Sequence, residues 1–166
     1  MKLAPIVLFT YNRPWHTRQT IDALLKNELS SESEFFIYSD APKNDTAIDS
    51  VKQVRAFIKT IDGFKKITIV EREKNWGLAN SIIDGVTKIV NEYGKIIVLE
   101  DDLVIAPCFL KSMKNNCRSA INAKQVMQIS GNMFDVVVES KADAIFLPFT
   151  TSWGWATWER SWKHFD

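Results

Sequence analysis

The segment 96–107, which reads IIVLEDDLVIAP, holds the feature around which the chain is organised. Its first four residues are apolar and partly β-branched, which predicts a short strand buried on both faces. Three carboxylates follow directly, at Glu100, Asp101 and Asp102. Like charges so close together are unfavourable unless a positive group binds them. Oxygen ligands suit Mg²⁺ or Mn²⁺, so the end of this strand is a predicted metal site.

A solvated acidic loop is the alternative interpretation of these three acids. They follow a buried type of strand and precede an apolar turn rather than a polar tail, which favours a binding site. Because successive strand residues point to opposite faces, Glu100 and Asp102 are expected on one side and Asp101 on the other. The three acids are therefore expected to have different roles.

Composition describes an ordinary globular domain. The chain has 166 residues, of which 46% are hydrophobic and 25% charged. Its net charge is +1, and no basic run with interleaved aromatic residues occurs, so no nucleic-acid partner is indicated. Cys108 and Cys117 lack CxxC spacing and a nearby histidine. They are interpreted as reduced thiols of a cytosolic protein rather than as a disulfide or a zinc site.

The two ends of the chain bear on its localisation and domain organisation. Residues 1–5 lead directly into an apolar strand, without the pattern of a signal peptide. No apolar stretch approaches the roughly 20 residues that span a bilayer. We therefore expect a cytoplasmic protein without a transmembrane segment. The chain stops inside a tryptophan-rich pattern, which predicts a single domain over 1–166 that is truncated at its C-terminus.

Strand and helix patterns alternate along the chain, as is typical of an α/β domain with a mainly parallel sheet. The predicted strands are 6–11, 35–39, 66–70, 96–99, 126–131 and 143–148. The predicted helices are 15–26, 48–61, 78–91 and 109–121. Neither GxGxxG nor GxxxxGK[ST] occurs, so Rossmann dehydrogenases and P-loop NTPases lose their main support.

Polar residues follow three of the predicted strands. Residues 10–13 (TYNR) come after the first strand, Asp40 after the second and the three acids after the fourth. Ligands of open α/β sheets bind beyond the carboxyl ends of the strands, so we expect these groups at one edge. There Asp40 is suited to accept the N–H of a nucleobase such as uracil, and Arg13 to contact a diphosphate. The local alternative for both is a simple turn.

These segments resemble a GT-A-type nucleotide-sugar glycosyltransferase of the family 2 kind. The resemblance rests on PIVLFTYNR at 5–13, Asp40, NWGLAN at 75–80 and LEDDLVIAP at 99–107. The acidic segment, with Phe109 and Leu110 behind it, is similar to the metal motif of N-acetylglucosaminyltransferase I. The resemblance implies a three-layer α/β/α, Rossmann-like fold of the nucleotide-diphospho-sugar transferase type, with a mainly parallel mixed sheet.

The resemblance also implies roles for individual residues. Asp102 would bind Mn²⁺ or Mg²⁺, which also holds the diphosphate of the donor. Asp40 would read the uracil of a UDP-sugar, while Asp101 would face the ribose or sugar and Glu100 the donor sugar. The remaining donor-pocket residues that it implies are Thr10, Arg13, Asn75, Gly77 and Asn80.

The tryptophan-rich C-terminal part resembles the acceptor side of the same enzymes. Gly154-Trp155 is similar to their GLGW segment, which implies an acceptor side at Trp153, Gly154 and Trp155. The alternative is that these tryptophans fill the core, since Trp is mostly buried. A general base must accept the proton of the incoming hydroxyl. In the resembled enzyme it lies downstream of the Gly-Trp segment, so we expect it beyond Asp166 and nominate no catalytic residue.

The predicted function is metal-dependent transfer of a hexosyl or N-acetylhexosaminyl group from a nucleotide-sugar, foremost a UDP-sugar, to a saccharide or other hydroxyl acceptor. A divalent cation would neutralise the leaving diphosphate, and inversion is an expectation from the resemblance. One alternative is a sugar nucleotidyltransferase, although the Gly-rich opening loop of that class is absent from 6–14. The other is a non-catalytic nucleotide-sugar-binding domain or fragment.

Overall fold

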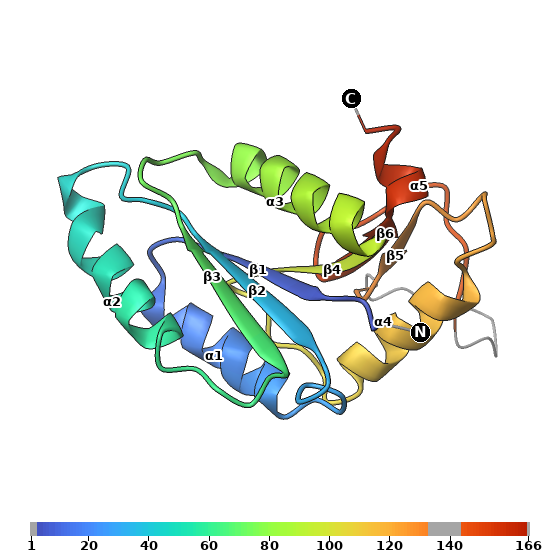
Figure 1. Ribbon diagram of the computed structural model, residues 1–166, viewed down its shortest axis with the longest axis horizontal. Helices are drawn as coiled ribbons and strands as arrows, with labels where there is room; N and C mark the ends of the chain where they lie inside the picture. The colour runs from blue at the N-terminus through green and yellow to red at the C-terminus, as the bar shows by residue number, and fades with distance from the viewer. Residues whose placement is uncertain (1–2, 133–143, 166) are drawn as a thin grey trace.

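The computed structural model describes residues 3–132 and 144–165. Its centre is a six-stranded sheet in the order β3-β2-β1-β4-β6-β5, with helices on both faces (Figure 1). The strands are β1 (Ile6–Thr10), β2 (Glu34–Ser39), β3 (Lys66–Glu71), β4 (Lys95–Glu100), β5 (Gln128–Ser130) and β6 (Trp155–Trp158). The helices are α1 (Pro14–Leu25), the 3₁₀ turn η1 (Asp45–Ala47), α2 (Ile48–Ile58), α3 (Leu78–Tyr93), α4 (Phe109–Ser119) and α5 (Glu159–Trp162).

The first four strands are parallel to one another. β1 pairs with β2 and β4, and β2 pairs with β3. β6 then pairs antiparallel with β4, and β5 antiparallel with β6. All five residues of β1 are buried, as expected for a central parallel strand covered on both faces. The predicted three-layer α/β fold with a mainly parallel mixed sheet is confirmed.

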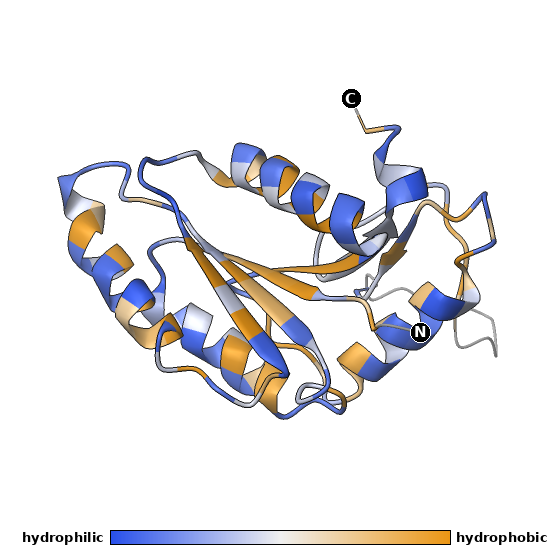
Figure 2. Ribbon diagram, in the orientation of Figure 1, coloured by the Kyte–Doolittle hydropathy of each residue, from blue (hydrophilic) through white to orange (hydrophobic). Residues whose placement is uncertain are grey.

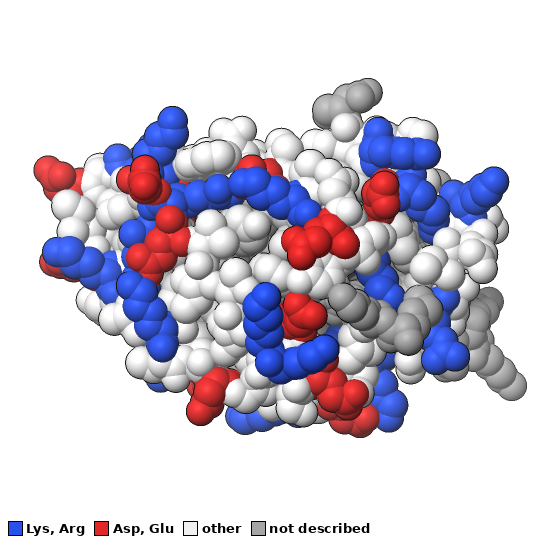
Figure 3. All heavy atoms as spheres, in the orientation of Figure 1, with Lys and Arg blue, Asp and Glu red and all other residues white. Residues whose placement is uncertain are grey.

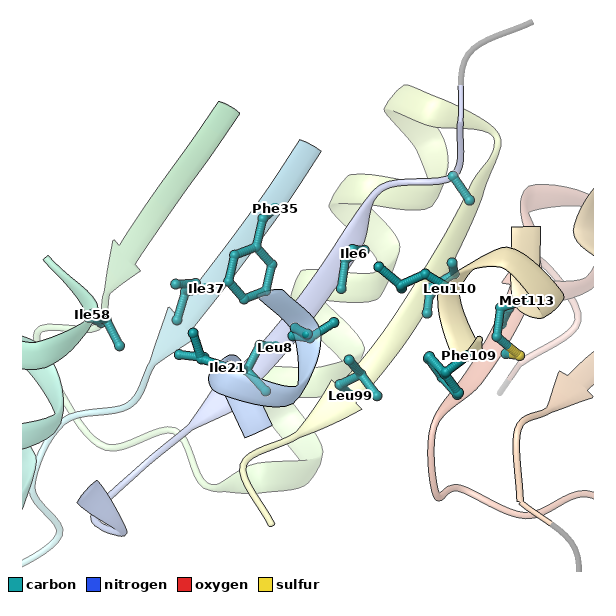
Figure 4. Close-up of a cluster of buried hydrophobic side chains, with 14 of the residues drawn as sticks. Ile6, Leu8, Ile21, Phe35, Ile37, Ile58, Leu99, Phe109, Leu110 and Met113 are labelled. Atoms are coloured by element: carbon teal, nitrogen blue, oxygen red, sulfur yellow. The ribbon is translucent and has the colours of Figure 1, made fainter. Parts of the chain in front are cut away.

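Two apolar cores lie on the two faces of the sheet. Ile97 and Leu99 of β4 face the core that α1, α2 and α4 cover, part of which Figure 4 shows. Ile96 and Val98 face the other core, which α3 covers. Figure 2 shows the apolar residues concentrated in the strands, while the helices carry many hydrophilic residues. This alternation fixes the register of β4, because a shift by one residue would exchange its two faces.

The C-terminal part of the sheet differs from the prediction. The described part of the predicted strand 143–148 is not a strand, and Asp143 lies outside the described residues. Phe146 there is 85% exposed, so its apolar character does not reflect burial in a sheet. The strand beside β4 is instead β6, inside the tryptophan-rich segment. The predicted strand 126–131 corresponds to the shorter β5.

Two glycines allow the β5 and β6 ends to pack on α4. Gly154 has φ +67°, and a Cβ there would lie 3.1 Å from the Phe109 ring. At Gly131 an added Cβ would overlap the same ring, and the Gly131 amide donates to the Gly154 carbonyl over 2.7 Å. Gly154 thus has a structural reason to be glycine.

No helix of the described residues is suited to span a membrane. None within 3–132 and 144–165 combines the length and the apolar character needed to cross a bilayer.

Candidate functional site

The carboxyl ends of β1, β2 and β4 meet at one edge of the sheet. The Asp40 amide donates to the Thr10 carbonyl over 3.0 Å, which joins the ends of β1 and β2. The Tyr11 amide donates to Asp101 Oδ2 over 3.1 Å, which joins the ends of β1 and β4. The prediction that these three polar strand ends share one edge is confirmed.

The three acids lie in different surroundings. β4 ends at Glu100, and Asp101 and Asp102 form a turn, so strand alternation does not extend to Asp102. The expectation that Glu100 and Asp102 share a strand face therefore does not apply. Asp101 is buried against Tyr11, whereas the Asp102 side chain is 44% exposed. Only Asp102 combines proximity to the other acids with substantial access to solvent.

Three carboxyl groups, those of Glu100, Asp101 and Asp102, lie close together at this edge. Burial raises the pKa of Glu100, and the neighbouring Asp102 and Asp101 raise it further. Burial also raises the pKa of Asp101, while the hydrogen bond from the Tyr11 amide and the charge of Arg13 act in the opposite direction. Arg13 Nη1 lies 2.7 Å from Asp102 Oδ2 and 4.0 Å from Asp101 Oδ1. The Arg13 guanidinium therefore offsets part of the negative charge of these acids.

These residues fit a metal ion that is shared with a ligand. Within the described part of the chain, no three His, Cys, Asp or Glu side chains come together to hold a metal. Mg²⁺ commonly binds through one or two carboxylates plus substrate phosphates and water. An exposed carboxylate at Asp102 suits that arrangement. The edge is suited to a cation held jointly by Asp102 and a diphosphate, rather than to a preformed metal centre.

Asp40 is 6% exposed and fixes the loop that precedes α3. Its Oδ1 accepts from the amides of Ala41 and Trp76, both over 2.9 Å. Its Oδ2 accepts from the Gly77 amide over 2.9 Å and from Asn75 Nδ2 over 3.1 Å. A carboxylate has about four lone-pair sites, so these four donors fill it. In this conformation Asp40 has no vacant acceptor for the N–H of uracil.

The same carboxylate stabilises the start of α3. Gly77 is the N-cap of this helix, with φ +73°, a conformation that favours glycine. The first amides of a helix lack partners within it and carry partial positive charge, which an anion offsets. Asp40 supplies that anion at Gly77. Asn80, which is exposed, donates from Nδ2 to the Trp76 carbonyl over 2.9 Å and closes the loop.

Thr10 does not line an open pocket. It is 4% exposed, and its hydroxyl donates to the Tyr38 carbonyl over 3.4 Å inside the sheet. Tyr11 is the neighbouring residue that reaches the surface of the edge. Its hydroxyl accepts from the Lys43 amide over 3.0 Å, in the loop after β2. Of these two residues, Tyr11 is therefore the more accessible to a ligand at this edge.

Two arginines that the sequence analysis did not nominate support the loop. Arg72 is buried, forms an ion pair with Asp84 and lies 4.1 Å from the Trp76 ring. Arg55 Nη2 donates to the Arg72 carbonyl over 2.7 Å and to the Ser39 carbonyl over 3.3 Å. Arg55 is a charged residue within the apolar face of α2, and this position could have indicated from the sequence that its side chain has a buried partner. Arg72 lies in a charged run that looks like a surface loop, so no local signal identifies it.

Two of the C-terminal tryptophans, Trp155 and Trp158, form core. Trp155 is 7% exposed and stacks on Trp162 at 6.0 Å, so it presents no free face to a sugar ring. Trp158 is 2% exposed and donates from Nε1 to the Cys117 carbonyl over 3.2 Å. Trp153 is 54% exposed. Because β6 runs antiparallel to β4, Trp153 and Gly154 lie beside the acidic end of β4.

A hollow on the described surface lies next to the candidate site. It measures about 720 Å³ and includes Asn75, Trp76 and Asn80 in its lining. A second hollow of about 560 Å³, between α1 and α2, contains none of the predicted site residues. Figure 3 shows acidic and basic side chains interspersed on the visible face, without the continuous basic surface of a nucleic-acid-binding domain.

Solved structures share this architecture. The mannosyltransferase PcManGT from Pyrobaculum calidifontis, in complex with GDP-Man and Mn²⁺, superposes with a TM-score of 0.56 at 14% identity. TarS of S. aureus superposes with a TM-score of 0.51 at 17% identity. The alignments cover 78% and 75% of this chain, but only 35% and 20% of those proteins. At such identities the likeness concerns the fold.

Sequence comparison gives the family. No curated protein matches the chain. The model of the family "Glycosyl transferase family 2" matches residues 6–127, which include β1, the Asp40 loop, the start of α3 and the acidic turn. That range covers most of the chain and all of the candidate donor edge. The chain therefore belongs to glycosyl transferase family 2 and has the GT-A fold.

Proposed function

We propose that this chain is the donor-binding domain of a metal-dependent glycosyltransferase that uses a nucleotide-sugar, foremost a UDP-sugar. The observation that carries the proposal is the acidic turn at the end of β4, where exposed Asp102 and buried Asp101 face Arg13. Family membership supports the same class of activity. We further propose that the enzyme transfers a hexosyl or N-acetylhexosaminyl group. The acceptor would be a saccharide or another hydroxyl compound, and the configuration at the anomeric carbon would be inverted.

Each residue of the edge has a distinct task in this proposal. A bound Mn²⁺ or Mg²⁺ would neutralise charge on the leaving nucleoside diphosphate. Asp102 offers the cation an exposed carboxylate oxygen. Asp101 joins the ends of β1 and β4 through Tyr11, and thereby holds the turn in place. Asp40 keeps the loop 75–77 in position, while Glu100 lies close to the other two acids and is available to the donor sugar.

Trp153 is the residue that we propose for the acceptor side. Its exposure and its place beside the end of β4 suit an aromatic surface for a pyranose ring. Gly154 and Trp155 would support it indirectly, through the turn at Gly154 and the packing of Trp155. The general base stays unassigned, and we expect its carboxylate downstream of this segment.

Thermal unfolding tests the proposal. UDP should raise the melting temperature when Mn²⁺ or Mg²⁺ is present and have little effect without it. Asp102→Asn should abolish the shift, because the amide is a weak metal ligand. Asp22→Asn, an exposed change on α1, serves as the matched control and should retain it. The same assay includes GDP-mannose as an alternative donor and GDP as the corresponding nucleoside diphosphate. The absence of a metal-dependent shift with every nucleoside diphosphate would contradict the proposal.

Turnover distinguishes an enzyme from a binding domain. Incubation with UDP-sugars and Mn²⁺ should release UDP slowly, with water as the acceptor. A chain that binds UDP with metal but releases none from any nucleotide-sugar would support the non-catalytic alternative instead.

A further inference from the structure

Arg13 forms an ion pair with the carboxylate that the proposed function assigns to the metal. Its Nη1 lies 2.7 Å from Asp102 Oδ2, within hydrogen-bonding distance, and 4.0 Å from Asp101 Oδ1. The Arg13 and Asp102 side chains are 52% and 44% exposed, so both have room to move. A guanidinium in this position and a divalent cation on Asp102 compete for the same oxygen.

The backbone of Arg13 is fixed even though its side chain is not. Arg13 is the N-cap residue of α1, and its carbonyl accepts from the Thr17 amide over 2.9 Å and from the Thr17 hydroxyl over 2.8 Å. Pro14 follows and restricts the chain further. The guanidinium can therefore exchange partners without a change in the helix.

We propose that Arg13 is a cation surrogate that couples metal binding to nucleotide binding. Without a divalent cation it neutralises Asp102. A divalent cation bound to Asp102 would displace the guanidinium, because two positive charges in contact with the same carboxylate repel each other. The released guanidinium then pairs with the diphosphate of the nucleotide, for which its planar, two-pronged donor geometry is suited. The inference rests on the proposed function. It adds that the cation binds Asp102 first and that Arg13 then pairs with the diphosphate.

Exchange of this kind predicts opposite effects on two affinities. Arg13→Met removes the competitor, so Mn²⁺ alone should bind about two- to fivefold more tightly, in line with the strength of an exposed ion pair. The same variant lacks a charged partner for the diphosphate, so UDP in saturating Mn²⁺ should bind about tenfold more weakly. The coupling between the two ligands is reciprocal, so the factor by which UDP strengthens Mn²⁺ binding must fall equally. A variant that is merely misfolded would weaken both affinities.

The experiment measures Mn²⁺ alone by electron paramagnetic resonance of the free ion, and UDP in saturating Mn²⁺ by calorimetry. It compares the unaltered chain with Arg13→Met, with Arg13→Lys and with Arg18→Met. Arg18 lies on the same helix and stacks on the Phe57 ring at 4.1 Å, so its variant should change neither affinity. Arg13→Lys keeps the charge and should leave the affinity for Mn²⁺ near that of the unaltered chain.

Three results would overturn the inference. The first is equal Mn²⁺ affinity in the unaltered chain and Arg13→Met. The second is a change of both affinities in the same direction in an Arg13→Met chain that unfolds at the same temperature as the unaltered chain. The third is an equal change in Arg18→Met. The proposed function fails separately, if the unaltered chain does not bind UDP even in saturating Mn²⁺. The measurement with Mn²⁺ alone still tests the exchange in that case.

Discussion

Asp40→Asn is the substitution that most directly tests the architecture of the site. Asparagine has the size of aspartate but replaces one acceptor oxygen by an amino group. Asp40 Oδ1 accepts from the amides of Ala41 and Trp76, and Oδ2 accepts from the Gly77 amide and Asn75 Nδ2, with a longer contact of 3.2 Å from the Trp76 amide. Either orientation of the new amide therefore turns an NH₂ group toward at least two N–H donors.

The expected loss follows from these contacts. Two hydrogen bonds to an ionised acceptor disappear, and each contributes about 1.5–3 kcal/mol. Relaxation of the loop 75–77 recovers part of this, so we expect the free energy of unfolding to fall by about 3 kcal/mol. Loss of the anion at the start of α3 acts in the same direction.

Urea unfolding followed by far-UV circular dichroism measures the change. The midpoint should fall while the m-value stays constant, since the surface exposed on unfolding is the same. Asp22→Asn is the exposed control and should change the stability by less than about 0.5 kcal/mol. If Asp40→Asn behaved like this control, the loop would not depend on Asp40. A variant of full stability but altered preference between UDP and GDP would instead show that Asp40 reads the base.

Two further predictions concern the packing of the domain. Burial lowers the pKa of Lys114 to about 8, so between pH 8 and its ordinary value of 10.5 the unfolded chain binds more protons and stability rises with pH. Urea titrations at several pH values should show that Lys114→Met loses this gain relative to the unaltered chain, and identical pH profiles would contradict it. Trp155→Ala should lower the free energy of unfolding by about 3–5 kcal/mol, because it leaves a cavity in the core under α3. Trp153→Ala should lower it less, and an equal loss would contradict the different burial of the two residues.

Local sequence patterns were sufficient to predict the parallel half of the sheet. β1 and β4 are short apolar runs that end in polar residues, and both signals depend only on neighbouring positions. The edge at which Asp40 and the acidic turn meet follows from the parallel topology itself. Hence the position of this part of the site could be predicted from the sequence.

The remaining features depend on contacts between distant residues. Asp40 lies 37 positions from the Gly77 amide that it binds, and no local pattern indicates that its acceptors are filled. The segment Trp155–Trp158 lacks the alternation of apolar and polar residues that indicates a half-buried strand. Its tryptophans were therefore interpreted as a possible sugar-binding surface rather than as strand β6. Strand alternation predicted that Glu100 and Asp102 share a face, although the strand ends at Glu100, two residues before Asp102.

The hydrogen bond from the Tyr11 amide to Asp101 has a consequence for how the protein becomes functional. It joins residues 90 positions apart, and β1 lies between β2 and β4 in the sheet. Closing so long a segment is entropically unfavourable until other strand pairs hold it. During synthesis the donor edge is therefore incomplete until more than 100 residues have left the ribosome. Metal-dependent UDP binding would then report completion of the sheet, and a refolding experiment that follows both signals should find that binding appears last.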